Sequence, residues 1–273
     1  MKQKSCHINQ IIALIVILGV LFSNAIPVSS QLPRVVKKLQ QNGECRRCNL
    51  EGLDLRGLFL QNVDLRRAKL RGANLRGANL SNANLQQADL RESDLRDANL
   101  KDADLSRVKL AGANLRNTQL DAEKLEPKWR LVWQIVNYPE PWTEDLSGQD
   151  LAEANLENVD FSQTQLIGTN LEDANLKGAK FSHINLSHAK LRRANLFVAN
   201  LSHTDLSYAD LKYTDLSYAN LSHANLSFSN LSHAIVNSTN LSHANLQGAN
   251  LDKVDLENAD LTNTNLGTAI VDP

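Results

Sequence analysis

The chain has 273 residues, of which 29 are basic and 30 acidic, so its formal net charge is −1 at pH 7. This balance argues against a uniformly acidic or basic surface, the usual mark of a protein that mimics or binds nucleic acid. The sequence also lacks a G-x-S-x-G motif, a Gly-rich phosphate loop and an H-E-x-x-H motif. We therefore expect no enzymatic activity, no cofactor and no catalytic residues.

Residues 1–30 have the pattern of a signal peptide. Lys2 and Lys4 precede an apolar run from Ile11 to Phe22, and small residues follow, with cleavage expected after Ala25 or Ser30. The run has 12 residues, fewer than the roughly 20 that span a bilayer, so an uncleaved anchor is the less favoured alternative. We expect an extracytoplasmic mature protein without a membrane span, in a periplasm or a thylakoid lumen.

Residues 31–49 form a predicted N-terminal cap. Residues 32–40 are basic and amphipathic, which suits a short helix covering the open end of the fold that follows. Signal cleavage would remove Cys6 and leave Cys45 and Cys48, an even pair in an oxidising compartment. The favoured interpretation is a disulfide or a buried thiol pair. A redox motif or half of a metal site is the alternative, but no βαβ pattern surrounds the pair.

Leucine recurs at every fifth residue in two blocks, residues 50–125 and 145–273, and a small residue, usually Ala, stands two positions before it. A period of five matches neither the helical 3.6 nor the strand period of 2. It matches a chain that turns a corner every five residues and points two side chains inward. A short fixed period of this kind predicts an all-β solenoid.

The units ANLRG, ADLRE, ANLSH and TDLSY resemble the pentapeptide-repeat family, whose pattern is A-(N/D)-L-x-x, over about three quarters of the chain. The resemblance implies a right-handed quadrilateral β-helix with four units per coil, hence about ten coils. Residues 20 apart would then stack in one column. A Cys pair just before the first repeat is common in exported members, which supports the bonded interpretation of Cys45 and Cys48.

Residues 126–144 interrupt the period and contain all three tryptophans. Trp129, Val132, Trp133 and Val136 follow the i, i+3, i+4, i+7 spacing of an apolar helical stripe. The segment resembles a helical insertion of other exported family members. We expect the helix to pack on the flank of one continuous rod. The alternative is a docking patch made of exposed Trp129, Trp133 and Trp142.

Two side-chain columns follow from the 20-residue coil. The first is an arginine column made of Arg56, Arg76, Arg96 and Arg116. It could bind a polyanion such as an envelope polysaccharide, although a solvated face is the favoured interpretation. The second is a histidine column: His183, His203, His223 and His243. Neighbouring imidazoles resist being charged together, so this column is a candidate pH-responsive element. Duplication of a coil is its simplest origin, and parallel rings converge poorly on a metal ion, so no metal site is predicted.

The same corner position on other faces carries His188, Tyr208, Tyr213, Tyr218, Phe228 and His233. We expect a non-catalytic, exported binding or structural rod whose contact surfaces are the tryptophan helix and these corners, with an unidentified protein partner. The repeats run to Val271 without a cap, so self-association through the C-terminal coil is expected as well. Polyanion binding through the arginine column is the alternative. A DNA mimic that binds gyrase, as the best-understood family members do, is less favoured because of the charge balance and the export signal.

Overall fold

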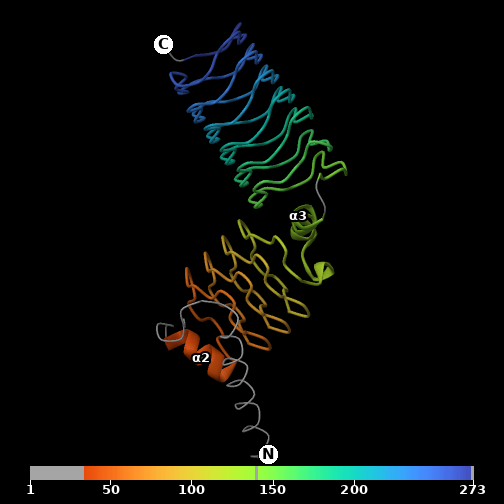
Figure 1. Cartoon of the computed structure of the whole chain (residues 1–273), viewed down its shortest axis with the longest axis vertical. Coiled ribbons are helices and arrows are strands. Elements are labelled where there is room, and N and C mark those ends of the chain that lie inside the picture. The colour runs from red at the N-terminus through yellow and green to blue at the C-terminus, as the bar shows by residue number, and fades with distance from the viewer. Residues whose placement is uncertain (1–33, 139–140, 272–273) are drawn as a thin grey trace, which may run out of the picture. The chain divides into compact units, whose positions relative to one another are not determined.

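The structure, a computed structural model, describes residues 34–138 and 141–271. It divides into two compact units, Met1–Gly43 and Glu44–Pro273. The predicted signal peptide lies outside the described residues. In the first unit, helix α2 runs over Arg34–Asn42 (Figure 1). Gly43 ends it at a φ of +68°, and its N–H donates to the Leu39 carbonyl at 2.9 Å. The capping role of α2 stays a prediction. No helix among the described residues is long and apolar enough to cross a membrane.

The second unit is a solenoid in which nearly every five-residue segment adds one bridging residue to a parallel ladder. The residue just before each leucine bridges the residue 20 positions later, as in Asn74↔Asp94 and Asp94↔Asn114. The leucine N–H of one coil donates to the next coil, for example Leu75 to Asp94 O at 2.8 Å. Such bridges run from Glu44 to Gln119 and again from Asp150 to Ile270. The 20-residue column spacing predicted from the sequence is therefore present in both blocks.

The interior is filled by the two inward side chains of each unit. Leucines such as Leu75 and Leu201 and the small residues before them, such as Ala73 and Ala199, are almost completely buried. The two phenylalanines at centre positions, Phe161 and Phe181, lie 20 residues apart and stack on each other at 5.2 Å between ring centroids. Placing both large rings in one column lets adjacent coils accommodate them together.

At nearly all described corners, the second residue after the centre has a left-handed backbone. Glycine takes this position in some units, but many L-residues take it too, such as His203 at φ 58°, Tyr218 at 60° and Val198 at 52°. The conformation is held because the N–H of the corner residue donates to the next coil, as His203 does to Ser222 O at 3.0 Å. Side chains at this position point away from the core.

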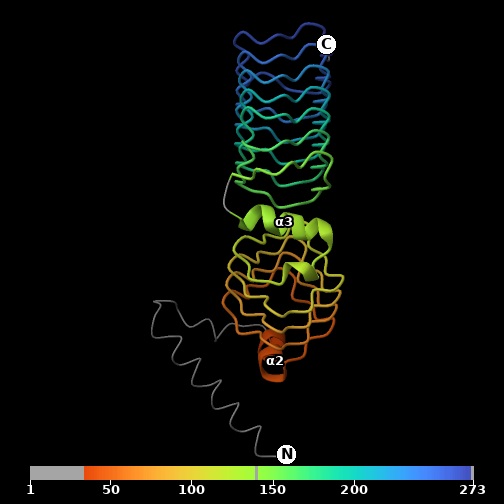
Figure 2. The ribbon, with the colours of Figure 1, turned by 90° about the vertical axis from the view of Figure 1, so that its right-hand side faces the viewer.

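Between the blocks, a short 3₁₀ turn, η3 (Ala122–Lys124), leads into helix α3 (Pro127–Asn137). Figures 1 and 2 show α3 lying between the two stacks of coils. Val132 and Ile135 are each 1 % exposed and belong to the core cluster of the second block. On the other side, the indole N–H of Trp133 donates to Thr118 of the first block, 3.0 Å from its Oγ1.

The prediction that this helix packs on the flank of one continuous rod is therefore wrong. The physical reason is the distribution of its apolar residues, because Leu131 and Ile135 extend the predicted stripe around the helix. A helix that is apolar on most sides needs two surfaces to cover it. The ends of the two blocks supply those surfaces, and α3 occupies the place of a coil.

Direct bonds along one side keep the two blocks in a defined register. The N–H of Gly112 donates to Glu153 O at 2.7 Å, and the Arg116 guanidinium donates to Glu157 O at 2.9 Å, 41 residues further along the chain. Both bonded pairs are 41 residues apart, and this offset places Glu157 in line with the arginine column. The histidine column then lies on the corner next to the one that continues the arginine column. The sequence leaves this relation open, because the insertion hides how the columns of the two blocks align.

Candidate functional site

The three tryptophans, predicted as a docking patch in the alternative interpretation, are mostly covered. Trp142 is 9 % exposed and belongs to the core cluster of the second block. Trp129 is half-buried against the same cluster, and the ammonium of Lys128 lies 5.2 Å from its ring. Trp133 is bonded to the first block as described above. These rings hold the junction of the two blocks together and do not form an exposed patch.

The arginine column is largely neutralised by partners within the protein. Arg56 and Arg96 each form an ion pair at 2.6 Å with the aspartate two residues earlier, Asp54 and Asp94. Hydrogen bonds from Arg96 lower the pKa of the Asp94 carboxyl, so the pair stays charged at neutral pH. The partners of the other two guanidiniums are Asp97 for Arg76, at 3.1 Å, and Glu157 O for Arg116, at 2.9 Å.

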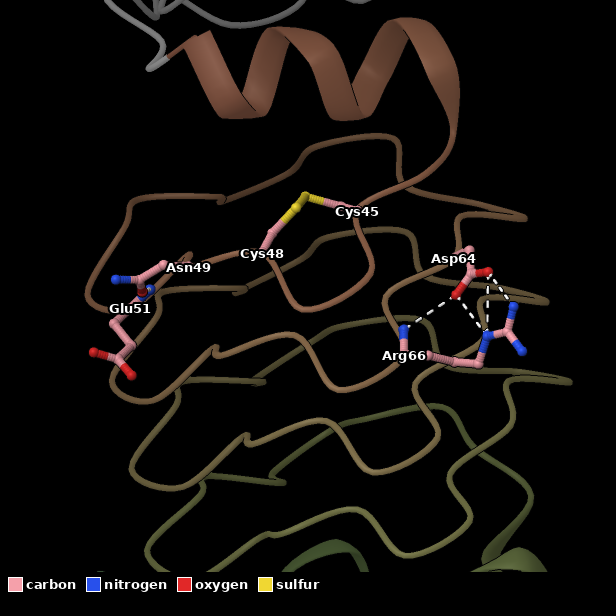
Figure 3. The surroundings of a disulfide bond; sticks show 6 residues. All are labelled: Cys45, Cys48, Asn49, Glu51, Asp64 and Arg66. Atoms are coloured by element: carbon pink, nitrogen blue, oxygen red, sulfur yellow. Dashed lines mark hydrogen bonds and ion pairs between the residues drawn. A yellow bond between two sulfur atoms is a disulfide. The ribbon is translucent and has the colours of Figure 1, made fainter.

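Cys45 and Cys48 form a disulfide in the first turn of the solenoid (Figure 3). Their Cα atoms lie 5.2 Å apart, and the Cys48 N–H donates to Cys45 O at 3.2 Å, which closes a tight turn. The Cys45 N–H joins the turn to the next coil through Asp64 O at 2.7 Å. The Asp64 carboxylate accepts from Arg66 and Arg46, whose hydrogen bonds lower its pKa well below the ordinary range.

The histidine column is a continuous stack of imidazole rings. The centroid separations of His183–His203, His203–His223 and His223–His243 are each 4.6 Å, with interplanar angles of 7°, 2° and 5°. All four side chains are exposed at the corner. Loss of hydration in the stack, together with the charges of His183 and His223, lowers the pKa of His203 below its ordinary value of 6.5.

Aromatic side chains occupy the other corners of the second block. His188, Tyr208 and Phe228 form one stack, with centroids 5.1 and 5.3 Å apart. Tyr213 stacks on His233 at 4.8 Å. These rings remain exposed, from 42 % for Tyr213 to 59 % for Tyr218. The sequence shows this feature through the 20-residue spacing, although the contacts between the rings become visible only in the structure.

Cations lie against the aromatic corners. The Lys212 ammonium and the Arg192 guanidinium lie 5.1 and 5.6 Å from the ring centroid of Tyr213. Lys177 lies 5.6 Å from that of Phe197, which meets Tyr218 edge to face at 5.4 Å. This part of the surface therefore combines exposed rings with positive charge, and aromatic and arginine side chains are both enriched at protein interfaces.

Two small clefts lie in the second unit of the structure. One, of about 140 Å³, lies at the junction of the blocks and is lined by Arg96, Arg116, Asn155 and Glu157, among others. Another, of about 220 Å³, is lined by residues that include His233, Ile235 and Lys253. Within residues 34–138 and 141–271, no three His, Cys, Asp or Glu side chains gather closely enough to hold a metal ion as they stand.

A family model described as pentapeptide repeats matches residues 44–82, 78–117, 145–178, 169–197, 199–237 and 237–269, in eight copies. The chain belongs to this family, whose members are generally structural or binding proteins, so the resemblance seen in the sequence is confirmed. A comparison with curated proteins finds no match.

Solved structures of other family members are similar to this chain. HetL of the cyanobacterium Nostoc sp. strain PCC 7120, a protein involved in the regulation of heterocyst differentiation, is 30 % identical, with 86 % of this chain and 92 % of HetL covered and a TM-score of 0.31. A protein of the Arabidopsis thaliana thylakoid lumen is 32 % identical over 41 % of this chain and 65 % of its own, with a TM-score of 0.18. QnrB1, a plasmid-mediated fluoroquinolone resistance protein, is 15 % identical, with 81 % and 92 % covered and a TM-score of 0.24.

Proposed function

We propose that this protein is a non-catalytic binding protein whose solenoid presents a rigid surface to a protein partner. The observation that carries the proposal is the set of exposed, mutually stacked rings at the corners of the second block. A ring that already stacks on its neighbour loses little conformational freedom when a partner covers it. Such pre-ordered aromatic side chains are efficient interface anchors.

We place this activity outside the cytoplasm. The support is the signal-peptide pattern of residues 1–30 together with the disulfide between Cys45 and Cys48, since disulfides persist in oxidising compartments. A periplasm and a thylakoid lumen both meet this condition. We also propose the finer details of the fold, namely a right-handed solenoid of about ten coils that α2 caps.

The test compares two variants of the tagged mature protein in a capture experiment from its native compartment. Tyr213→Ala with Tyr218→Ala removes two corner rings, and the matched control Phe59→Ala removes an exposed ring of the first block, where Phe59 is 52 % exposed. We expect a specific partner that is retained by the control and lost by the double variant. Retention of every partner by the double variant would contradict the assignment of the surface.

Polyanion binding through the arginine column is the second candidate, suggested by the 20-residue spacing of its guanidiniums. The ion pairs of Arg56, Arg76 and Arg96 weaken it, because a polyanion must compete with carboxylates that are already in place. Binding to an immobilised sulfated polysaccharide, measured at two salt concentrations, tests it. Arg76→Gln with Arg96→Gln should reduce binding and its salt dependence if the column takes part.

A gyrase-binding role as a DNA mimic has less support, since the net charge of −1 provides no strongly acidic surface. A DNA supercoiling assay with gyrase and a fluoroquinolone tests it. Protection of the enzyme by this protein would revive that role.

A further inference from the structure

The histidine column has a property that the aromatic corners lack, because each of its rings faces another imidazole. The backbone fixes the spacing of the four residues. The N–H groups of His183, His203 and His223 donate to Ser202 O, Ser222 O and Ser242 O at 3.1, 3.0 and 2.9 Å. All four corners share the left-handed conformation, with φ between 58° and 63°. The imidazoles therefore stand in a straight, exposed row at the ring spacing of 4.6 Å.

From this arrangement we propose that adjacent imidazoles of the histidine column bind a divalent transition-metal ion in pairs, with Cu²⁺ bound most tightly. Neutral imidazole nitrogen is a good ligand for copper, nickel and zinc, and affinities for a given site rise to a maximum at Cu²⁺ in the first-row series. Two imidazoles supply two ligands, and water completes the coordination shell.

The rings must turn before they can share an ion. Metal–nitrogen bonds of about 2.0–2.1 Å place two ligating nitrogens about 3–4 Å apart. The stacked rings are 4.6 Å apart and nearly parallel, so their nitrogen lone pairs do not converge as they stand. The four side chains are exposed at a corner. Rotation about the side-chain bonds therefore sacrifices a ring-stacking contact and leaves the core intact.

The charged groups beside the column favour a cation. The Asp260 carboxylate interacts electrostatically with His243, and Asp205 follows His203 by two residues. The Lys180 ammonium, on the segment before His183, is already paired with Asp160 at 3.2 Å. The serines that precede the histidines carry no charge. Asp260 therefore favours a cation near His243, and the Lys180 ammonium near His183 is neutralised by a partner.

The remaining histidines of the second block provide a matched control. His188 stacks on Tyr208, and His233 stacks on Tyr213, so neither has a second imidazole as its stacking partner. Every adjacent pair of the column includes His203 or His223. The double variant His203→Gln/His223→Gln therefore removes all pairs, whereas His188→Gln/His233→Gln removes the same number of imidazoles and none of the pairs. Glutamine is compatible with the corner, because Gln87 has a φ of 59°.

The experiment is titration of the untagged mature protein with Cu²⁺ at neutral pH by calorimetry, with electron paramagnetic resonance to detect nitrogen ligands. We expect nitrogen-coordinated Cu²⁺ in the unaltered protein and in the His188→Gln/His233→Gln control. The column variant should lose affinity about tenfold or more, together with the nitrogen signature. The proposal is overturned if the unaltered protein binds no Cu²⁺ or if both double variants lose binding equally. Circular dichroism confirms that each variant is folded.

Discussion

The corner at Val198 offers a direct test of the physical account of the fold. Val198 has a φ of 52° and its side chain is 46 % exposed. A left-handed backbone costs an L-residue about 1–2 kcal/mol, and the cost is highest for a β-branched side chain. Asparagine adopts this conformation more readily and occupies the equivalent corner at Asn62, where φ is 59°. Val198→Asn should therefore relieve strain.

The magnitude follows from two opposing terms. Relief of the backbone contributes about 1–2 kcal/mol. Complete burial of a valine is worth at least about 1.5 kcal/mol, and this one is roughly half buried, so the substitution forfeits about 0.7 kcal/mol. The net increase in the free energy of unfolding is about 0.3–1.3 kcal/mol. For a protein of this size, that corresponds to a rise in Tm of about 1–5 °C.

The assay is thermal and guanidinium unfolding followed by circular dichroism, with the reciprocal change Asn62→Val as the control. The control should lower Tm by a similar amount, because it introduces the same strain at an exposed corner of the first block. If Val198→Asn leaves stability unchanged or lowers it while Asn62→Val is neutral, corner strain is not a significant term and the reasoning fails.

Three further outcomes follow from named contacts. Trp133→Phe removes the indole N–H that bonds Thr118, so it should cost about 1 kcal/mol and expose the junction of the blocks to limited proteolysis. The pKa of His203 is lower in the folded protein than its ordinary 6.5, so the native state binds fewer protons than the unfolded state. The contribution of His203 to the free energy of unfolding should therefore be constant above about pH 6.5 and fall below it. His203→Gln should reduce that fall in unfolding experiments at pH 7.5 and 5.5. Gly248→Ala should destabilise by about 1–2 kcal/mol in chemical unfolding, since the new Cβ would lie 2.7 Å from ring carbons of Phe228 at a φ of +68°.

The sequence predicts the repeat architecture well because a single period encodes both the interior and the corners. The 20-residue columns are all present, and the pairing of Arg96 with Asp94 could be foreseen from their separation of two residues. The ion pair between Arg76 and Asp97 could not be foreseen, because it joins neighbouring coils and depends on the direction in which the Arg76 side chain extends.

The apolar stripe in the sequence predicts the wrong position for α3 for a related reason. Helical periodicity shows which residues are apolar, but it does not say how many surfaces will cover them. Ile135 lies outside the four-residue stripe and is nevertheless buried. Counting it would have favoured a helix covered on two sides. The register of the two blocks depends on bonds such as Gly112 to Glu153, which only the folded chain reveals.

The central claim, that the aromatic corners of the second block contact a protein, is tested most directly by site-specific photo-cross-linking in the native compartment. A photoreactive residue replaces Tyr218, which is 59 % exposed, and in a parallel sample it replaces Asn62 at the equivalent position of the first block. We predict a defined adduct from position 218 that unlabelled protein competes away, and none from position 62. An adduct from position 62 alone, or none from position 218, would contradict the account.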